Sequence, residues 1–82
     1  MKSNNKLNQN RRNRINELKS LVIAVNEKGQ CASYKKTIAH YSLITGTARR
    51  TVIEYLNLLI DAEIITKHGD DMDYVDGNDI LK

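Results

Sequence analysis

The sequence predicts a mainly α-helical domain in which three helices are followed by a small β-hairpin. Three observations lead to this prediction. Apolar residues recur at three- and four-residue spacing in three segments before residue 62, as they do along amphipathic helices. Gly29 and Gly46 separate these segments. After residue 63 the apolar residues fall instead into two short β-prone runs around a turn.

Size and composition limit the class of protein. A chain of 82 residues makes one small domain. A folded body of roughly 70 residues buries only about 60% of its unfolded surface, so dimerisation would add stability. The single Cys31 excludes an intrachain disulfide and a Cys-rich zinc site, and we expect it to be reduced and buried. Neither a membrane-spanning apolar run nor a secretory signal is present, which predicts a soluble, cytoplasmic protein without a membrane partner.

The N-terminal segment is predicted to form a flexible basic arm over residues 1–11, followed by the folded domain over residues 12–82. The arm has too little apolar surface to offset the entropy of ordering it. The first helix is predicted from about Arg12 to Asn26, with Gly29 as its stop. Its apolar stripe consists of Ile15, Leu18, Leu21, Val22 and Val25.

A second helix is predicted between the next two turns. The preceding residues, QCAS, are short enough for one brief strand. Ser33 or Thr37 is expected to cap the helix, and Gly46 is expected to end it. The side chains expected to face inward are Ile38, Tyr41 and either Ile44 or Thr45.

The third helix is predicted to begin with Thr47 as its cap and to run to about Asp61. The residues predicted on its buried side are Ala48, Val52, Tyr55, Leu56 and Leu59. The residues predicted to point outward are Arg49, Arg50, Ile53, Glu54 and Asn57. An apolar Ile53 among outward polar residues is unusual for a helix with a purely structural role.

The C-terminal part is predicted to form a hairpin. Residues 64–67 and 72–75 are β-prone, and the intervening His68-Gly69-Asp70-Asp71 has the composition of a turn. Asp76-Gly77-Asn78-Asp79 forms a further turn, after which Ile80 and Leu81 return to the core or contact a partner.

Charge is distributed unevenly along the chain. Residues 1–50 hold eleven Lys or Arg and two Glu, a balance of +9, whereas residues 51–82 hold two Lys and eight Asp or Glu, a balance of −6. The two balances add to the net charge of +3. A basic half that includes an arginine pair at a helix start is typical of a protein that binds a polyanion.

Over about residues 12–76 the chain resembles the winged helix-turn-helix family. The resemblance rests on Gly46 at the turn, Arg49-Arg50-Thr51-Val52 and Tyr55-Leu56 in the third helix, and Asp61-Ala62-Glu63-Ile64-Ile65 at its exit. It implies three helices with a two- or three-stranded wing. It also implies sequence-specific binding of double-stranded DNA, with the third helix (about residues 47–61) in the major groove, and regulation of transcription as a homodimer.

The sequence departs from the family pattern at several positions. Glu63 replaces a common glycine, Thr47 follows the turn glycine in place of an aliphatic residue, and Tyr41-Ser42 replaces a Leu-Ala pair. The hairpin is also acidic, so its aspartates would repel phosphates and the wing is expected to point away from DNA or to contact a protein. The alternative function is therefore a winged-helix interaction module whose acidic wing docks a basic partner.

The candidate DNA-binding residues come from three places. The third helix carries arginines that could contact base edges or phosphates, hydroxyl groups that could contact phosphates, and weaker candidates at the groove edge. The second helix and the arm carry positively charged side chains that could contact phosphates. In chain order they are Arg11, Arg12, Arg14, Lys35, Lys36, Thr47, Arg49, Arg50, Thr51, Ile53 and Asn57. The alternative for the arginines is a solvated surface, with Arg50 paired to Glu54 at four-residue spacing.

Catalysis, cofactors and metals have no support in the sequence. His40 and His68 lie in different predicted elements, and Cys31 has no evident base nearby in sequence, so we expect no enzyme activity. A calcium loop read from Asp71 fails, because Asp76 stands where the loop requires glycine. No cofactor or small-molecule ligand is expected. The first helix, with Ile80 and Leu81, is the expected dimer contact.

Overall fold

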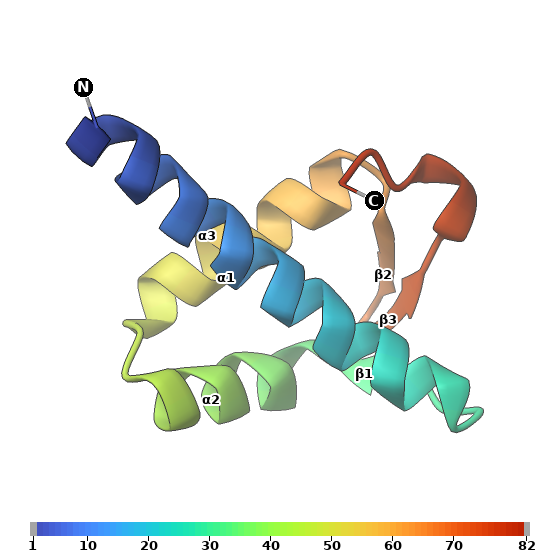
Figure 1. Cartoon of the computed structure of the whole chain (residues 1–82). Coiled ribbons are helices and arrows are strands. Elements are labelled where there is room, and N and C mark those ends of the chain that lie inside the picture. The colour runs from blue at the N-terminus through green and yellow to red at the C-terminus, as the bar shows by residue number, and fades with distance from the viewer. Residues whose placement is uncertain (1, 82) are drawn as a thin grey trace.

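The computed structural model describes the backbone of residues 2–81 and the side chains of residues 10–81. The elements, in order, are α1 (Lys2–Glu27), β1 (Ala32–Ser33), α2 (Tyr34–Thr45), α3 (Arg49–Asp61), β2 (Ile65–His68), β3 (Asp71–Tyr74) and the short 3-10 helix η1 (Asp76–Asn78). In Figure 1, α1 crosses in front of α3, α2 lies below these two helices, and the sheet lies near the C-terminal end of α1. The predicted fold class, three helices with a small antiparallel wing, is confirmed.

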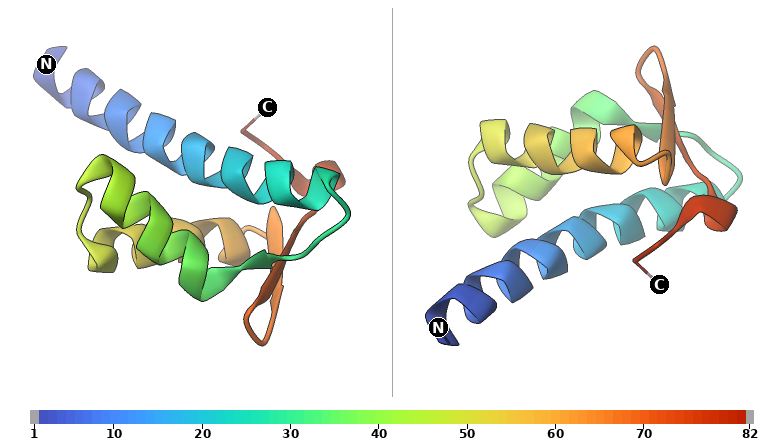
Figure 2. Two further views of the ribbon diagram at one scale, coloured as in Figure 1. Left: turned by 90° about the horizontal axis from the view of Figure 1, so that it is seen from below. Right: turned by 90° about the horizontal axis from the view of Figure 1, so that it is seen from above.

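The first helix is longer than the sequence predicts. Helix α1 begins at Lys2, not near Arg12, so residues 2–11 continue the first helix. No glycine or proline interrupts residues 2–27, and extending a formed helix needs only one residue to be fixed per hydrogen bond gained. The first turns project beyond the other helices (Figures 1 and 2). The side chains of Lys2 and Lys6, which belong to the predicted arm, lie outside the described side chains.

The core lies where the helices meet the inner face of the sheet. Its fully buried side chains are Leu18, Val22, Val52, Leu56, Leu59, Ile64, Ile65 and Met72. Ile38 and Tyr41 of α2 complete it, as predicted. The periodic residues of all three helices therefore face one another, and their burial supplies most of the stabilising free energy.

Helix α2 begins and ends as the sequence predicts. The Lys36 N–H donates to the Ser33 hydroxyl over 3.1 Å, which makes Ser33 the N-cap. Gly46 adopts φ +73°, a left-handed conformation that favours glycine, and its N–H donates to the Ser42 carbonyl. The prediction that Ile44 or Thr45 points inward is wrong, because Ile44 is 67% exposed and Thr45 is exposed as well. The Thr45 hydroxyl instead donates to the Tyr41 carbonyl of the preceding turn.

The prediction that Thr47 caps α3 is wrong. Ala48 occupies the N-cap position without a side-chain hydrogen bond, and it is exposed instead of buried. Thr47 is only 6% exposed, and its hydroxyl accepts from the Arg14 guanidinium over 2.9 Å and lies within hydrogen-bond distance of the Thr45 hydroxyl, at 2.8 Å. The turn thus extends over three residues, 46–48, and directs Thr47 toward α1 instead of toward the open end of α3.

The exit from α3 shows why a glycine would suit the position of Glu63. Glu63 is the only non-glycine residue with a positive φ among the described residues, at +62°. Its N–H donates to the Ile60 carbonyl, which closes the helix and turns the chain into β2. A side chain in this left-handed conformation costs about 1–2 kcal/mol, and a glycine would remove that cost.

The sheet has the order β1-β3-β2, and all its pairs are antiparallel. The predicted strand in QCAS is confirmed as β1, which pairs Ala32 with Met72. Because β1 is so short, Asn26 of α1 completes the edge of β3, and its side-chain oxygen accepts from the Tyr74 N–H over 2.7 Å. The prediction of a buried Cys31 is wrong: alternation along the strand turns Ala32 inward and leaves Cys31 exposed.

The C-terminal tail is fastened to α1 by a buried ion pair. The Lys19 ammonium donates to the Asp79 carboxylate over 2.6 Å, and the two side chains are 9% and 1% exposed. The Tyr74 hydroxyl donates to the same oxygen over 2.7 Å, and the Leu81 N–H donates to the other. Leu81 then packs against the core, whereas Ile80 is 81% exposed.

Candidate nucleic-acid interface

The outward face of α3 carries the arginine pair. Arg49 and Arg50 occupy the first turn, and both are exposed. Within the described side chains neither forms a hydrogen bond or salt bridge, and the expected alternative pair between Arg50 and Glu54 is absent. Both guanidinium groups are therefore available to an external partner. Their ten N–H donors would suit base edges or phosphates.

Other candidates on α3 are less accessible. Ile53 and Thr51 are half-buried, and Ile53 packs against the core at the edge of the helix. Thr47 is not available to a phosphate, because it is buried and its hydroxyl is already in contact with Arg14 and Thr45. Asn57 is exposed two helical turns after Arg50, on the same outward stripe.

The start of α2 lies beside this stripe. Lys35 and Lys36 are exposed in its first turn, where the helix dipole also favours anions. Asp70 of the hairpin turn already occupies the same helix end, and it accepts from the Ser33 hydroxyl and, over 2.9 Å, from the Lys35 N–H. These two hydrogen bonds hold the pKa of Asp70 below its usual value. This acidic residue of the wing thus helps to cap α2.

Three side chains from α2, α3 and β2 meet at one point and form what we call the Tyr34 cluster: Tyr34, Asn57 and Lys67. The Tyr34 hydroxyl donates to Asn57 Oδ1 over 3.2 Å. The Lys67 ammonium lies 4.8 Å from the centre of the Tyr34 ring, within the range of a cation–π contact. Tyr34 and Lys67 could not be predicted as site residues from the sequence, since no spacing rule connects residues from three separate elements.

The hairpin separates its charges between two faces. Residues that pair across strands share a face, so Lys67 lies on the side of its buried partner Met72. Asp71 and Asp73 lie on the opposite, outer side. Asp73 also accepts from the Cys31 thiol over 3.7 Å, and this contact raises the pKa of Cys31. Lys67 therefore lies on the helix-facing side of the wing, and Asp70 of the hairpin turn lies against the start of α2.

The arginines at the end of the predicted arm and just after it, Arg11, Arg12 and Arg14, lie along α1. The Arg14 guanidinium donates to the Thr47 hydroxyl over 2.9 Å. The Arg11 guanidinium lies 5.9 Å from the centre of the Tyr55 ring. Arg12 is exposed without a hydrogen bond or salt bridge to any described side chain. Two of these three arginines thus also help to hold α1 against α3.

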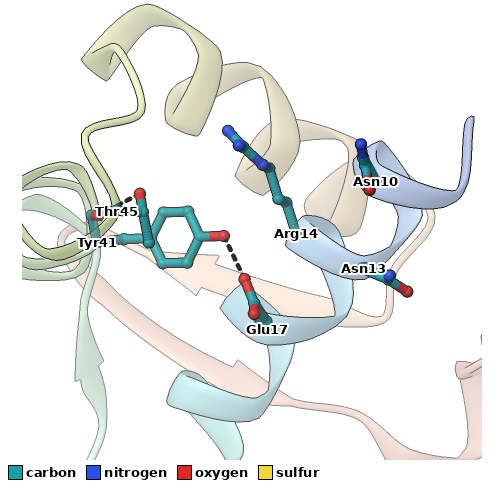
Figure 3. Close-up of a pocket in the computed structure, with 6 residues that line it drawn as sticks. All are labelled: Asn10, Asn13, Arg14, Glu17, Tyr41 and Thr45. Carbon is teal, nitrogen blue, oxygen red and sulfur yellow. Dashed lines mark hydrogen bonds between the residues drawn. The ribbon is translucent and has the colours of Figure 1, made fainter. Parts of the chain in front are cut away.

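Arg14 also borders an open polar hollow between α1 and α2. The hollow has a volume of about 360 Å³ and is lined by Asn10, Asn13, Arg14, Glu17, Tyr41 and Thr45. In Figure 3 the Tyr41 hydroxyl points across the gap to Glu17, to which it donates over 2.6 Å. Burial, followed by this contact, raises the pKa of Tyr41 well above its usual value. The hydroxyl therefore stays protonated and links α2 to α1.

Comparisons with protein-family models, curated proteins and solved structures found no match. Within residues 2–81, no helix is long and apolar enough to cross a bilayer. The described residues also contain no group of three or more His, Cys, Asp or Glu side chains placed to hold a metal ion. The fold and the arrangement of basic groups along α3 are therefore the basis for a functional proposal.

Proposed function

We propose that this protein binds double-stranded DNA sequence-specifically through α3 and regulates transcription. The observation that carries the proposal is the unpaired state of Arg49 and Arg50 on an exposed helix start. Guanidinium groups left without an acidic partner on the protein are suited to bind the acceptors of a nucleic acid. Bidentate pairing of arginine with guanine is the commonest specific contact of this kind.

In the proposed complex, α3 lies in the major groove with Arg49 and Arg50 toward the bases. Lys35 and Lys36 contact phosphates beside the groove, and Lys67 does so from the helix-facing side of the wing. Phosphate contacts of this kind fix the register of the helix, whereas base contacts select the sequence. The outer aspartates of the hairpin face away from the bound duplex, so their repulsion of phosphate is reduced by distance.

The proposal includes a homodimer that places two α3 helices about 34 Å apart, one duplex turn, on a two-fold related site. A shallow apolar groove beside α1 and the C-terminal tail supports this arrangement. It is lined by Ile15, Leu58, Leu59, Ala62, Ile64, Ile80 and Leu81. Ile80 and Leu58 are 81% and 45% exposed, so a second copy could cover apolar surface there. Light scattering should give twice the monomer mass for the wild type and the monomer mass for Ile80→Asp.

The decisive test measures the affinity for a random-sequence duplex across a salt series. The wild type should bind with an affinity that falls steeply as salt rises, and the Arg49→Ala/Arg50→Ala double variant should bind much more weakly. Lys28→Ala is the control, because it removes an exposed charge in the turn after α1, outside α3 and the first turn of α2. Absent or salt-insensitive binding by the wild type would overturn the proposal, and so would equal binding by the double variant.

A further inference from the structure

Arg14 is the first member of a chain of hydrogen bonds that joins α1 to the turn before α3. Its guanidinium donates to the Thr47 hydroxyl oxygen over 2.9 Å, and in Figure 3 its side chain extends from α1 toward that turn. The hydroxyl oxygens of Thr47 and Thr45 lie 2.8 Å apart, and the Thr45 hydroxyl donates to the Tyr41 carbonyl over 2.7 Å. The chain therefore connects α1, the turn and the end of α2.

The number of hydroxyl protons sets the direction of this chain. A threonine hydroxyl has one proton to donate, and a carbonyl oxygen can only accept. The Thr45 proton is used on the Tyr41 carbonyl, so the contact between the two hydroxyls uses the proton of Thr47. The Thr47 oxygen then accepts from Arg14, which is the donor at the head of the chain.

Thr47 in turn precedes the start of α3. It is 6% exposed, and its carbonyl accepts from the Ser42 hydroxyl over 2.6 Å. The next residue, Ala48, is the N-cap of α3 and has no side-chain hydrogen bond of its own. Thr47 is therefore the nearest preceding residue whose side chain is bonded to the rest of the fold. The placement of the first turn of α3, which carries Arg49 and Arg50, depends on how Thr47 is held.

We infer that Arg14 is a positioning residue, which acts through Thr47 to hold the first turn of α3 for DNA binding and is not itself a phosphate contact. This inference rests on the proposed DNA binding through α3. It separates Arg14 from Arg11 and Arg12, which the sequence places in the same group of candidates. Loss of a phosphate contact lowers both the affinity and its salt dependence, whereas loss of a positioning residue lowers the affinity alone.

The experiment uses a labelled duplex that carries the site selected by the wild type from a randomised library. Fluorescence anisotropy gives the affinity across a salt series, and stoichiometric titration gives the active fraction of each preparation. Arg14→Ala should bind about fivefold more weakly, the effect of one hydrogen bond, with an unchanged slope of log affinity against log salt. Thr47→Val should show the same loss, although this buried side chain carries no charge and keeps its size.

The two residues should also be coupled. The Arg14→Ala/Thr47→Val double variant should lose about fivefold, as each single variant does, instead of about twenty-fivefold, because both changes break the same chain. Thr47→Ser keeps the hydroxyl and should restore most of the affinity.

Arg12→Ala is the matched control. It removes the same charge from an exposed side chain of α1 that has no hydrogen bond or salt bridge to any described side chain. Any loss of affinity in Arg12→Ala should therefore come with a lower salt slope.

Three kinds of result would overturn the inference while leaving the proposed function intact. The first is a salt slope lower by about 1 in Arg14→Ala, which would make Arg14 a phosphate contact. The second is wild-type affinity in Thr47→Val, or additive losses in the double variant, because Arg14 would then act independently of Thr47. The third is an equal loss at an unchanged slope in Arg12→Ala. Failure of the proposed function is distinguishable, because then the wild type itself would select no site from the library and show no salt-dependent binding.

Discussion

The acidic and basic parts of the chain use their charges in different ways. In the hairpin and the tail, Asp70, Asp73 and Asp79 each accept hydrogen bonds from other elements of the fold. On the first turns of α2 and α3, the side chains of Lys36, Arg49 and Arg50 form no hydrogen bond or salt bridge within the described structure. These three acidic side chains thus connect elements of this protein, whereas these three basic side chains have no such contact within the described structure.

This difference changes how the charge balance should be interpreted. The balance of −6 over residues 51–82 would suggest a surface that repels DNA. The Lys19 ammonium offsets the charge of Asp79, and Asp71 and Asp73 lie on the outer face of the hairpin, opposite the face that carries Lys67. The net charge of a segment does not show in which direction each charged side chain points.

The largest expected effect comes from breaking the buried ion pair at the acidic end. Asp79→Asn should lower the free energy of unfolding by about 3 kcal/mol, because it leaves the Lys19 ammonium buried beside an uncharged amide. Asp71→Asn is the control: it makes the same change of charge at an exposed site on the hairpin. Chemical denaturation at neutral pH measures both. Equal stability of the two variants would show that the ion pair has no special role.

The same pair gives the stability a defined dependence on pH. Burial opposes ionisation of Asp79, but hydrogen bonds from Lys19 and Tyr74 outweigh it and lower the pKa to about 2. Because the folded pKa lies below the unfolded value of about 3.9, this contribution is complete above pH 4 and is lost as the pH falls toward 2. The stability difference between wild type and Asp79→Asn should therefore shrink over that interval, and a constant difference would contradict the assignment.

The next largest effect should appear at the basic end, in binding and not in stability. Lys35→Ala/Lys36→Ala should reduce the slope of log affinity against log salt by about 2, one for each lost phosphate contact. Because both side chains are exposed without hydrogen bonds, the melting temperature should stay the same. Fluorescence anisotropy on a labelled duplex gives the slope. An unchanged slope would place the start of α2 outside the interface.

The sequence predicted the fold well because its signals are local. The apolar stripe of each helix, the left-handed Gly46 and the Ser33 cap depend on residues a few positions apart. The errors came where the deciding contact is distant. Thr47 follows a helix-ending glycine like many caps, yet it is turned inward by Arg14, which lies 33 residues earlier in the chain. No local pattern contains that information.

The candidate site was predictable only in part for the same reason. Arg49, Arg50, Lys35 and Lys36 could be named from their positions at helix starts, and all four are exposed. The Tyr34 cluster could not be named, because it joins residues 34, 57 and 67 through the packing of three elements. Considered separately in the sequence, these three residues would be interpreted as a surface tyrosine, an exposed asparagine and a lysine in an acidic hairpin.

Not every acidic residue in the second half of the chain stabilises the fold, and Glu63 is predicted to destabilise it. Glu63→Gly should raise the free energy of unfolding by about 1 kcal/mol, because it removes a side chain from a left-handed backbone conformation at φ +62°. Glu63→Ala is the matched control: it removes the same charge but keeps a Cβ, and it should give no such gain. If the alanine variant were equally stabilised, the cause would be the charge and not the backbone.

The smallest effect is expected from the single cation on the helix-facing side of the wing. Lys67→Ala should reduce the salt slope by about 1, half the change expected for the double lysine variant, because one phosphate contact is lost. Lys28→Ala, which removes an exposed charge away from the Tyr34 cluster, should leave the slope as it is. A Lys67→Ala slope equal to that of the wild type would mean that the wing contributes no charge to binding. All the phosphate contacts would then come from cationic side chains on the helices.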